Sequence, residues 1–466
     1  MKKTLVFILA LFLVFSAACV PNKEDKNNEM TEISLDGMPD YSAYEADLHF
    51  TIGQWVNIPN KYSWLNYDTG KIENGSVLTD AEFEEQYRYI KEAGINLASN
   101  QLGEGSTAAC VKLLKNAEKQ GIGQIVFDAA LRNVLLDASI SDAEAVDRGM
   151  ELVESYKDSP ALVGHNMEDE PTLGEFDGLE RAYRRYKYIF PDKLFYTNLF
   201  PVIAPPSMVG EEYTDYVKAS AKKLPVKMIS YDHYPLYGYE GKTSVIDNFL
   251  LNMELVIDGK NPEQEMWTFL QSGNSAGTRA PETYADIAWQ AYSFMAFGGK
   301  GIWWFCYSEV PSERFSGMIN GKGERTEAYY LVQKVNKEIL SFDHVYLNFD
   351  WKGVLTYNGK NTEKLNENFA NLQSSLIDSH ERIANVEAEE DLLVGAFKDG
   401  DGRDGFMAVN FSDPGKNKSN KVKIVFNNCS KVLVVRHGVQ KAYLLKNGIF
   451  ETTFESGEGC FIIPVK

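Results

Sequence analysis

Between about residue 48 and residue 343, eight short apolar runs alternate with eight segments of helical periodicity. Several runs are continuously apolar at their centres, as in Ile125-Val126-Phe127, which is typical of parallel strands buried on both faces. The expected strands cover residues 49–58, 95–101, 123–130, 161–167, 194–200, 226–234, 265–271 and 301–307. This alternation predicts an α/β fold, a closed (β/α)₈ TIM barrel, rather than an open doubly wound sheet.

The segments between these runs carry helix signals. Thr79 with Glu82, and Ser141 with Glu144, have the spacing of a capping box, and Gly94 follows the first helix. The expected helices cover residues 80–93, 106–120, 142–157, 173–189, 213–223, 244–257, 283–297 and 326–340. No glycine-rich phosphate-binding motif follows any of the strands, which argues against a nucleotide-binding fold.

After about residue 345 the pattern changes to short β-rich runs separated by Gly, Asn, Asp and Pro. These runs cover residues 392–398, 405–410, 421–426, 431–436 and 459–465. They predict a C-terminal antiparallel β-sandwich. The expected domains are therefore the barrel, residues 45–343, and the sandwich, residues 344–466.

The N-terminus has the features of an export signal. Lys2 and Lys3 precede an apolar run, residues 4–15, that is too short to span a membrane. The next residues, Ser16-Ala17-Ala18-Cys19, resemble a bacterial lipobox, with Ser16 at the usual Leu position. The resemblance implies that residues 1–19 form a lipoprotein signal peptide, with Cys19 lipidated and anchored in the bacterial cell envelope. Residues 20–44 would be a tether; an ordinary signal peptide is the alternative.

Composition excludes several classes of function. A net charge of -19 argues against a nucleic-acid partner, because phosphate binding requires an excess of Lys and Arg. The cysteines after the signal have no metal-ligand spacing, so no metal and no cofactor are expected. Of these, Cys429 and Cys460 either form a disulfide or remain separate thiols.

In a (β/α)₈ barrel the active site is built at the C-terminal ends of the strands. The residues expected there are rich in carboxylates, amides and aromatic rings, which suits the protonation and binding of sugars. The candidate substrate-binding residues are Trp55, Asn100, Gln101, Asp128, Asn198, Tyr234, Gln271 and Trp304, and the candidate catalytic residues are Asp169, Glu170, Asp232 and Glu309.

The end of the fourth strand is the strongest of these candidates. Three successive carboxylates, Glu168-Asp169-Glu170, precede Pro171, and their repulsion is expected to raise at least one pKa. The sequence Asp169-Glu170-Pro171 resembles the Asn-Glu-Pro element of clan A glycoside hydrolases. The resemblance implies that Glu170 is the general acid/base of an enzyme acting on a carbohydrate. The barrel-plus-sandwich layout, Tyr234 and Trp304 are similar too.

The seventh strand departs from that family. Clan A retaining enzymes carry a nucleophilic Glu at its end, where this chain has Gln271. The second carboxylate would then come from another strand end, with Asp232, Glu309 or Asp128 as candidates; a distant one would make the enzyme inverting.

Two further alternatives remain open. Asp169 and Glu170 are similar to the Asp-Glu pair of substrate-assisted hexosaminidases, in which the substrate's own acetamido group attacks. Alternatively, catalysis has been lost and the chain is a surface glycan-binding lipoprotein. A metal-dependent hydrolase is disfavoured, because only His165 and His233 lie near strand ends.

Overall fold

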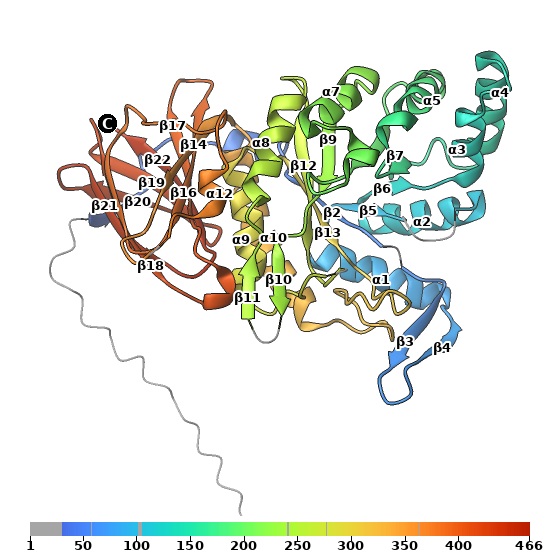
Figure 1. Cartoon of the computed structure of the whole chain (residues 1–466), viewed down its shortest axis with the longest axis horizontal. Coiled ribbons are helices and arrows are strands. Elements are labelled where there is room, and N and C mark those ends of the chain that lie inside the picture. Colours follow the sequence, from blue (N-terminus) through green and yellow to red (C-terminus); the bar gives the residue numbers. More distant parts are fainter. Residues whose placement is uncertain (1–29, 57, 101–104, 240–241, 276, 363) are drawn as a thin grey trace, which may run out of the picture.

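The computed structural model describes residues 30–56, 58–100, 105–239, 242–275, 277–362 and 364–466. Its larger part is a closed barrel of eight parallel strands in the order β12-β13-β2-β5-β6-β7-β8-β9 (Figure 1). The barrel strands are β2 (Thr51–Gln54), β5 (Leu97–Ser99), β6 (Gly123–Val126), β7 (Leu162–Asp169), β8 (Leu194–Leu199), β9 (Met228–Asp232), β12 (Glu265–Gln271) and β13 (Gly301–Phe305). Each lies within, or overlaps most of, one of the eight expected runs, and the predicted barrel is confirmed.

Helices surround the barrel, and short elements occupy the loops. The longer helices are α1 (Asp80–Glu92), α2 (Thr107–Gln120), α3 (Ala129–Leu136), α4 (Asp142–Val153), α5 (Phe176–Ile189), α7 (Tyr213–Lys223), α8 (Phe249–Gly259), α9 (Tyr284–Ala296) and α10 (Glu327–Leu340). The short ones are η1 (Ser42–Tyr44), η2 (Leu173–Glu175), α6 (Pro206–Val209), α11 (Asp343–Tyr346), α12 (Glu367–Ala370) and η3 (Pro414–Lys416). The capping box at Thr79 and Glu82 is present.

Several predicted elements had wrong bounds, and two of the differences have a clear structural reason. The third strand ends at Val126, because the Asp128 side chain caps the N-terminus of α3, which the prediction missed. The expected helix 244–257 starts only at Phe249. The residues before it belong to a hairpin of β10 (Leu236–Tyr239) and β11 (Lys242–Val245). A second hairpin, β3 (Lys61–Asn66) with β4 (Lys71–Val77), follows the first barrel strand.

The interior of the barrel is filled with aromatic rings. Trp303 packs against Trp55, Tyr196 and Phe269, with ring centroids 5.4 to 5.9 Å apart. Gly53 makes room for the Trp303 ring, since a Cβ at that position would come within 2.2 Å of it. The barrel is therefore a packed core, and a ligand is confined to its ends.

The C-terminal part is a two-sheet antiparallel structure, as predicted. One sheet has the order β1-β20-β19-β22-β17-β16-β14 and the other β15-β18-β21. Their strands are β14 (Phe349–Tyr357), β15 (Ile383–Ala388), β16 (Leu392–Asp399), β17 (Asp404–Asn410), β18 (Asn420–Phe426), β19 (Lys431–Arg436), β20 (Val439–Leu445), β21 (Ile449–Phe454) and β22 (Gly459–Val465). Apolar side chains of both sheets, including Val394, Ile424 and Phe450, form the core between them.

The strand β1 (Met30–Ile33) comes from the opposite end of the chain and pairs with β20. Tyr41, a few residues later, donates a hydrogen bond to Asp399 of the same sheet (2.9 Å). The predicted tether, residues 20–44, was therefore too long. Its second half is folded against the sandwich, because β20 offers an unpaired edge to an extended segment.

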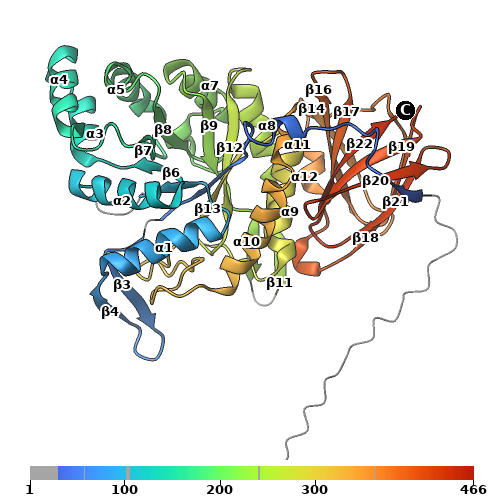
Figure 2. The same cartoon turned by 180° about the vertical axis from the view of Figure 1, so that it is seen from behind.

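Helix α9 joins the two parts of the molecule, lying between the barrel and the sandwich (Figures 1 and 2). Every residue from Ala285 to Ala296 is buried, including the polar Asp286, Gln290 and Ser293. The backbone of β16 approaches it closely at Gly395, where a Cβ would lie 2.1 Å from the Ala296 carbonyl oxygen.

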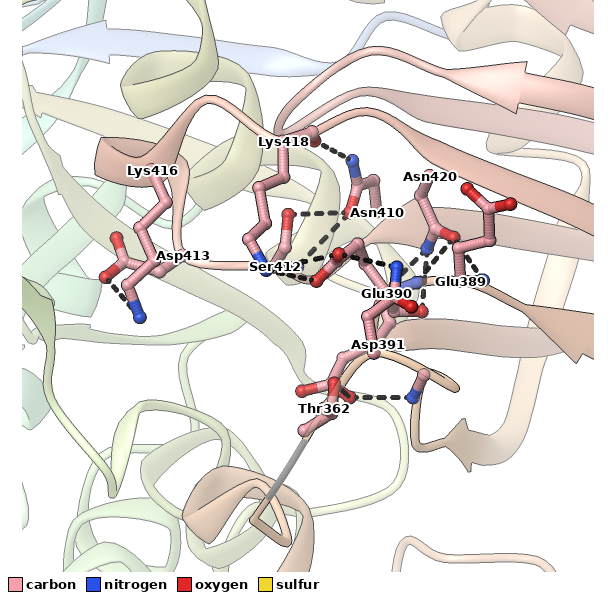
Figure 3. A network of polar contacts seen from close by, with 12 residues as sticks. Thr362, Glu389, Glu390, Asp391, Asn410, Ser412, Asp413, Lys416, Lys418 and Asn420 are labelled. Carbon is pink, nitrogen blue, oxygen red and sulfur yellow. Dashed lines mark hydrogen bonds and ion pairs between the residues drawn. The ribbon is translucent and has the colours of Figure 1, made fainter.

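A polar network at one end of the sandwich anchors the segment that continues to the barrel (Figure 3). Asp391 accepts hydrogen bonds from Gly359 N, Thr362 Oγ1 and Asn366 Nδ2 (2.7 to 2.9 Å). Two residues after Asn366, Asn368 donates a hydrogen bond to the Ile246 carbonyl just before α8 (2.8 Å). Asp391 is therefore satisfied by the protein itself.

Cys429 and Cys460 remain separate thiols and form no disulfide with each other. Among the described residues, no helix combines the length and apolar character that crossing a membrane requires.

Candidate active site

Three carboxylates gather at the C-terminal end of the barrel, on β7 and β9. Asp169 ends β7, Glu170 follows it, and Asp232 ends β9. Asn198 of β8 lies between them and donates a hydrogen bond from Nδ2 to Asp232 Oδ1 (3.1 Å). The backbone amide of Glu170 donates to the Asn198 carbonyl (2.8 Å). We call Asp169, Glu170 and Asp232 the carboxylate cluster.

The chain is irregular where it delivers two of these carboxylates. The pairing of β7 with β8 shifts register between Asn166 and Glu168, the mark of a β-bulge. Glu170 then adopts a left-handed conformation, with φ of 52°. Bulges re-aim side chains, and a non-glycine residue at positive φ costs energy that the surrounding structure must supply. Both features concentrate on the candidate acid, as is common at functional sites.

Burial and mutual repulsion raise the pKa of all three carboxyl groups. For Asp169, burial and then the charge of Glu170 raise the pKa to about 7, although a hydrogen bond from Asn198 acts in the opposite direction. Burial followed by the charges of Glu170 and Asp169 raises the pKa of Asp232 well above its usual range. Burial also raises the pKa of Glu170, opposed by a hydrogen bond with Asp232. The cluster therefore retains a proton at neutral pH, as a general acid requires.

Glu168, the remaining carboxylate of the sequence motif, does not belong to the carboxylate cluster. Glu168 forms an ion pair with Arg132 of α3, whose Nε also donates to the Met167 carbonyl (2.7 Å). The predicted repulsion within Glu168-Asp169-Glu170 thus acts mainly between the last two residues, while Arg132 neutralises the first.

A chain of hydroxyl groups beneath the cluster was missed by the sequence analysis. The Tyr196 hydroxyl lies 2.7 Å from Ser230 Oγ, and Ser230 Oγ donates to Asn198 Oδ1 (3.0 Å). This chain fixes the orientation of the Asn198 amide, so that Nδ2 points to Asp232. Strand alternation was the available signal, because Ser230 and Asp232 are two residues apart on one strand and so share a face.

Tyr234 lies beside the cluster, as predicted. Burial raises the pKa of its hydroxyl, and the next causes are the charges of Asp232, Asp169 and Glu170. Its ring packs on Phe305 at the end of β13 (centroids 5.2 Å apart). The structure therefore brings together five predicted site residues: Asp169, Glu170, Asn198, Asp232 and Tyr234.

Both predicted tryptophan platforms are wrong. Trp304 is fully buried and donates from Nε1 to Asn336 of α10 (2.9 Å), so it points away from the barrel axis. Trp55 is 3% exposed and packs inside the barrel against Phe269 (4.9 Å). Trp303 is the tryptophan of β13 that faces inwards, but it too is completely buried.

Asn100 and Asp128 were predicted to bind substrate, but in the structure they hold the backbone. Asn100 Oδ1 accepts from the Phe127 amide and joins two strand ends. Asp128 is 2% exposed; it caps α3 and also accepts from the Tyr156 hydroxyl (3.0 Å). Gln101 lies outside the described residues.

Gln271 is fully buried, and its amide is used by the protein. Its Oε1 accepts from the Leu236 amide (2.7 Å) and its Nε2 donates to the Arg279 carbonyl (3.0 Å). It holds the start of β10 rather than facing a ligand, which contradicts its predicted substrate-binding role.

Glu309 accepts from the Gly321 amide (2.7 Å), and it does not contribute to the raised pKa values of the carboxylate cluster. Its predicted catalytic role therefore gains no support from its position. It closes the loop that follows β13.

The two histidines near strand ends are also packed into the protein. His165 contacts the hydroxyls of Tyr156 (3.1 Å) and Tyr186 (3.0 Å), and burial lowers its pKa to about 3. His233 contacts Asn248 Oδ1 (2.9 Å). Over the described part of the chain, no three His, Cys, Asp or Glu side chains are grouped as metal ligands.

Comparison with known proteins supports the fold. Neither a protein-family profile nor a curated protein sequence matches the chain. A family 5 glycoside hydrolase from Bacteroides vulgatus is similar over 88% of this chain and 95% of its own, with a TM-score of 0.50 and 11% identity. A β-galactosidase from Marinomonas ef1 (TM-score 0.43, 10% identity, 63% of this chain) and a family 2 β-galacturonidase from Eisenbergiella tayi (0.41, 12%, 62%) are more distant.

The chain covers 60% of that β-galactosidase and 51% of that β-galacturonidase. At 11% identity, the likeness to the family 5 glycoside hydrolase shows a shared fold alone, and function has to be argued from the site.

Proposed function

We propose that this protein is a glycoside hydrolase in which Glu170 is the general acid/base and Asp232 the second carboxylate. The observation that carries the proposal is that Glu170 and Asp232 lie together at the mouth of the barrel, where burial raises both pKa values and each carboxyl group affects the pKa of the other. Such a pair shares a proton, so that one member donates it while the other acts as base or nucleophile. Its substrate would be a carbohydrate.

The closeness of the pair favours a retaining mechanism. Inverting enzymes hold their carboxyls roughly 6.5–9.5 Å apart, with a water molecule between them, whereas about 5 Å is typical of retention. Carboxyl groups that interact directly with each other leave no space for that water. Glu170 would protonate the glycosidic oxygen as the C–O bond breaks, and the Asp232 carboxylate would form the bond to the anomeric carbon. Water activated by Glu170 would then release the sugar.

Substrate-assisted catalysis is the second candidate. Strand β12 offers only the buried Gln271 at the usual nucleophile position, and Asp169 adjoins Glu170 in the cluster. In this scheme the acetamido oxygen of a 2-acetamido sugar attacks the anomeric carbon. Asp169 orients the acetamido group, and Asp232 is only a supporting group.

Two variants separate these mechanisms. Activity of wild type, Asp232→Asn and Asp169→Asn is measured on aryl glycosides with and without a 2-acetamido group, and product anomers are followed by NMR. Loss of activity in Asp232→Asn on substrates without an acetamido group supports the two-carboxylate mechanism. Strict dependence on the acetamido group, with inhibition by a thiazoline, supports substrate assistance.

A non-catalytic glycan-binding role is the outcome if no glycoside is cleaved while glycans still bind. The replacement of a strand-7 carboxylate by Gln271 is the feature that favours it.

We also propose lipidation at Cys19 and a location in the bacterial cell envelope. The sequence Ser16-Ala17-Ala18-Cys19 supports this proposal. Expression of the full chain and of Cys19→Ala, followed by membrane fractionation, tests it. Equal partition of both proteins would contradict it.

A further inference from the structure

A cavity of about 800 Å³ lies at the opposite end of the barrel from the carboxylate cluster. Its floor is made by side chains from the first residues of the strands, among them Val163, Phe195, Met228 and Trp267. Pockets for small organic ligands typically have volumes of roughly 300–1,000 Å³ and mostly apolar linings. The size and the floor of this cavity therefore suit an apolar molecule or group.

The rim of the cavity is basic, although the whole chain has a net charge of -19. Four lysines line it, Lys91, Lys187, Lys193 and Lys227, against two aspartates, Asp192 and Asp343. Such a local reversal of charge attracts anions, because a partly enclosed surface focuses the field of its own charges.

Most of these lysines are not neutralised by ion pairs. Lys193 Nζ donates to the Leu162 carbonyl (2.6 Å), and Lys187 Nζ donates to the Pro191 and Lys193 carbonyls (3.0 and 2.8 Å). Lys91 Nζ donates to the Gly121 carbonyl (3.4 Å). An ammonium group has three N–H donors, so Lys193 and Lys91 retain donors for a ligand.

Two of the acidic residues beside the cavity have partners of their own, and the third, Asp192, acts by its charge on Lys187. Asp343 accepts hydrogen bonds from the Phe50 and His344 amides (3.0 and 2.7 Å). Glu265, beside the floor, binds Lys227 Nζ (3.0 Å) and accepts from Trp267 Nε1 (2.9 Å). Neither carboxylate therefore compensates Lys193.

We propose that this cavity is a binding site for an organic anion with an apolar body, such as a carboxylate or sulfonate attached to rings or an acyl chain. The apolar body occupies the floor and the anionic group binds Lys193. The site is independent of the carboxylate cluster and of the proposed hydrolysis.

The test uses 8-anilinonaphthalene-1-sulfonate, whose fluorescence rises in an apolar site, and N-phenyl-1-naphthylamine, which has the same rings without the sulfonate. We expect saturable binding of the sulfonate, weakened by added salt, and weaker binding of the neutral amine. Lys193→Met should weaken sulfonate binding about tenfold, as expected for a lost bond to a charged group, and should leave binding of the amine unchanged.

Three control variants are measured beside Lys193→Met. Lys193→Arg should retain sulfonate binding. Lys360→Met, which removes a lysine 64% exposed on the sandwich, and Glu170→Gln at the opposite mouth should leave it unchanged. If Lys193→Met does not fold, Lys227→Met replaces it, since Lys227 is 72% exposed and a severalfold loss is expected. Absence of saturable binding, equal binding of the amine, or equal affinity of wild type and the folded lysine variant would overturn the proposal.

Discussion

The buried charged side chains at the two ends of the barrel have opposite signs and different partners. At the C-terminal end, Asp169, Glu170 and Asp232 face one another, and burial and repulsion raise their pKa values. At the N-terminal end, lysine ammonium groups bind backbone carbonyls, and burial lowers the pKa of Lys187 and brings that of Lys300 to about 8. Burial disfavours the charged form at both ends.

The two ends differ in the groups that bind their charged side chains. Most lysine ammonium groups at the N-terminal end have carbonyl oxygens as partners, whereas the carboxylates of the cluster have mainly one another and Asn198. An arrangement that costs stability and holds a proton is expected where chemistry takes place. This contrast supports the proposal that catalysis takes place at the mouth of the barrel, and four predictions test it.

The largest effect is expected for Glu170→Gln. The substitution is nearly isosteric but removes the proton donor, so kcat on glycosides should fall by about 10²–10⁴-fold. The loss should be smaller on aryl glycosides with good leaving groups, because these need less protonation. Steady-state kinetics measures the effect, and circular dichroism checks the fold. Unchanged kcat would remove Glu170 from the mechanism and the catalytic role from this end.

The Gln271→Glu variant tests whether a carboxylate at the end of the seventh barrel strand, β12, would face the substrate. The new carboxylate still accepts from the Leu236 amide, but it faces the Arg279 carbonyl, to which Gln271 donates. An unpaired buried charge is expected to lower the free energy of unfolding by about 3 kcal/mol without raising activity. Urea denaturation measures the free energy of unfolding, and Gln333→Glu on the outer helix α10 is the control. A gain in hydrolysis would show that the position faces the substrate.

The Asp169→Asn variant tests how much the carboxylate cluster lowers the free energy of unfolding. The folded-state pKa of about 7 lies above the model-compound value of 3.8, so the folded form binds the extra proton between these values. Stability of the wild type should therefore fall as pH rises from about 4 to about 7 and then level off. The variant should lose part of this dependence and gain on the order of 2 kcal/mol at pH 8. Unfolding curves at pH 5 and pH 8 measure it; a variant less stable than wild type at pH 8 would contradict a repulsive cluster.

Lys300→Met tests the other end and should give the smallest effect. The folded-state pKa of about 8 lies below the model-compound value of 10.5, so the unfolded form binds more protons between these values. This residue should make stability rise as pH increases from about 8 to about 10.5, the reverse of Asp169. The variant should lack that rise and be about 1 kcal/mol more stable than wild type at pH 7. Loss of stability there would mean that the contact of Lys300 with the Tyr346 ring, 4.7 Å from Nζ to the centroid, outweighs the cost of burial.

The carboxylate cluster was predictable because its members follow recognisable strands. Barrel geometry places all C-terminal strand ends at one face, so Asp169, Glu170, Asn198, Asp232 and Tyr234 had to lie near one another. The basic cavity at the other end was not predictable. Its lysines come from helix ends and loops far apart in the sequence, and no periodicity marks them.

Other assignments failed because strand alternation tells which residues share a face but not which face a ligand can reach. Trp303 and Trp304 must point to opposite faces of their strand, yet neither reaches the mouth, because one fills the barrel and the other binds Asn336. Asp128 looks like a strand-end carboxylate, yet it caps a helix that starts at the next residue. Gln271 looks like a vacant nucleophile position, yet it holds the start of the β10–β11 hairpin.

The sequence by itself determined the alternation of strands and helices, the sandwich that follows, and the carboxylates available at the fourth and sixth strand ends. These are local properties, set by periodicity and by the residue types at each strand end. Only the tertiary structure decided which carboxylates meet, since Arg132 neutralises Glu168 while Asn198 brings Asp169 and Asp232 together. Desolvation and repulsion depend on neighbours from other strands, and for that reason the chemical character of the site appears only in the folded protein.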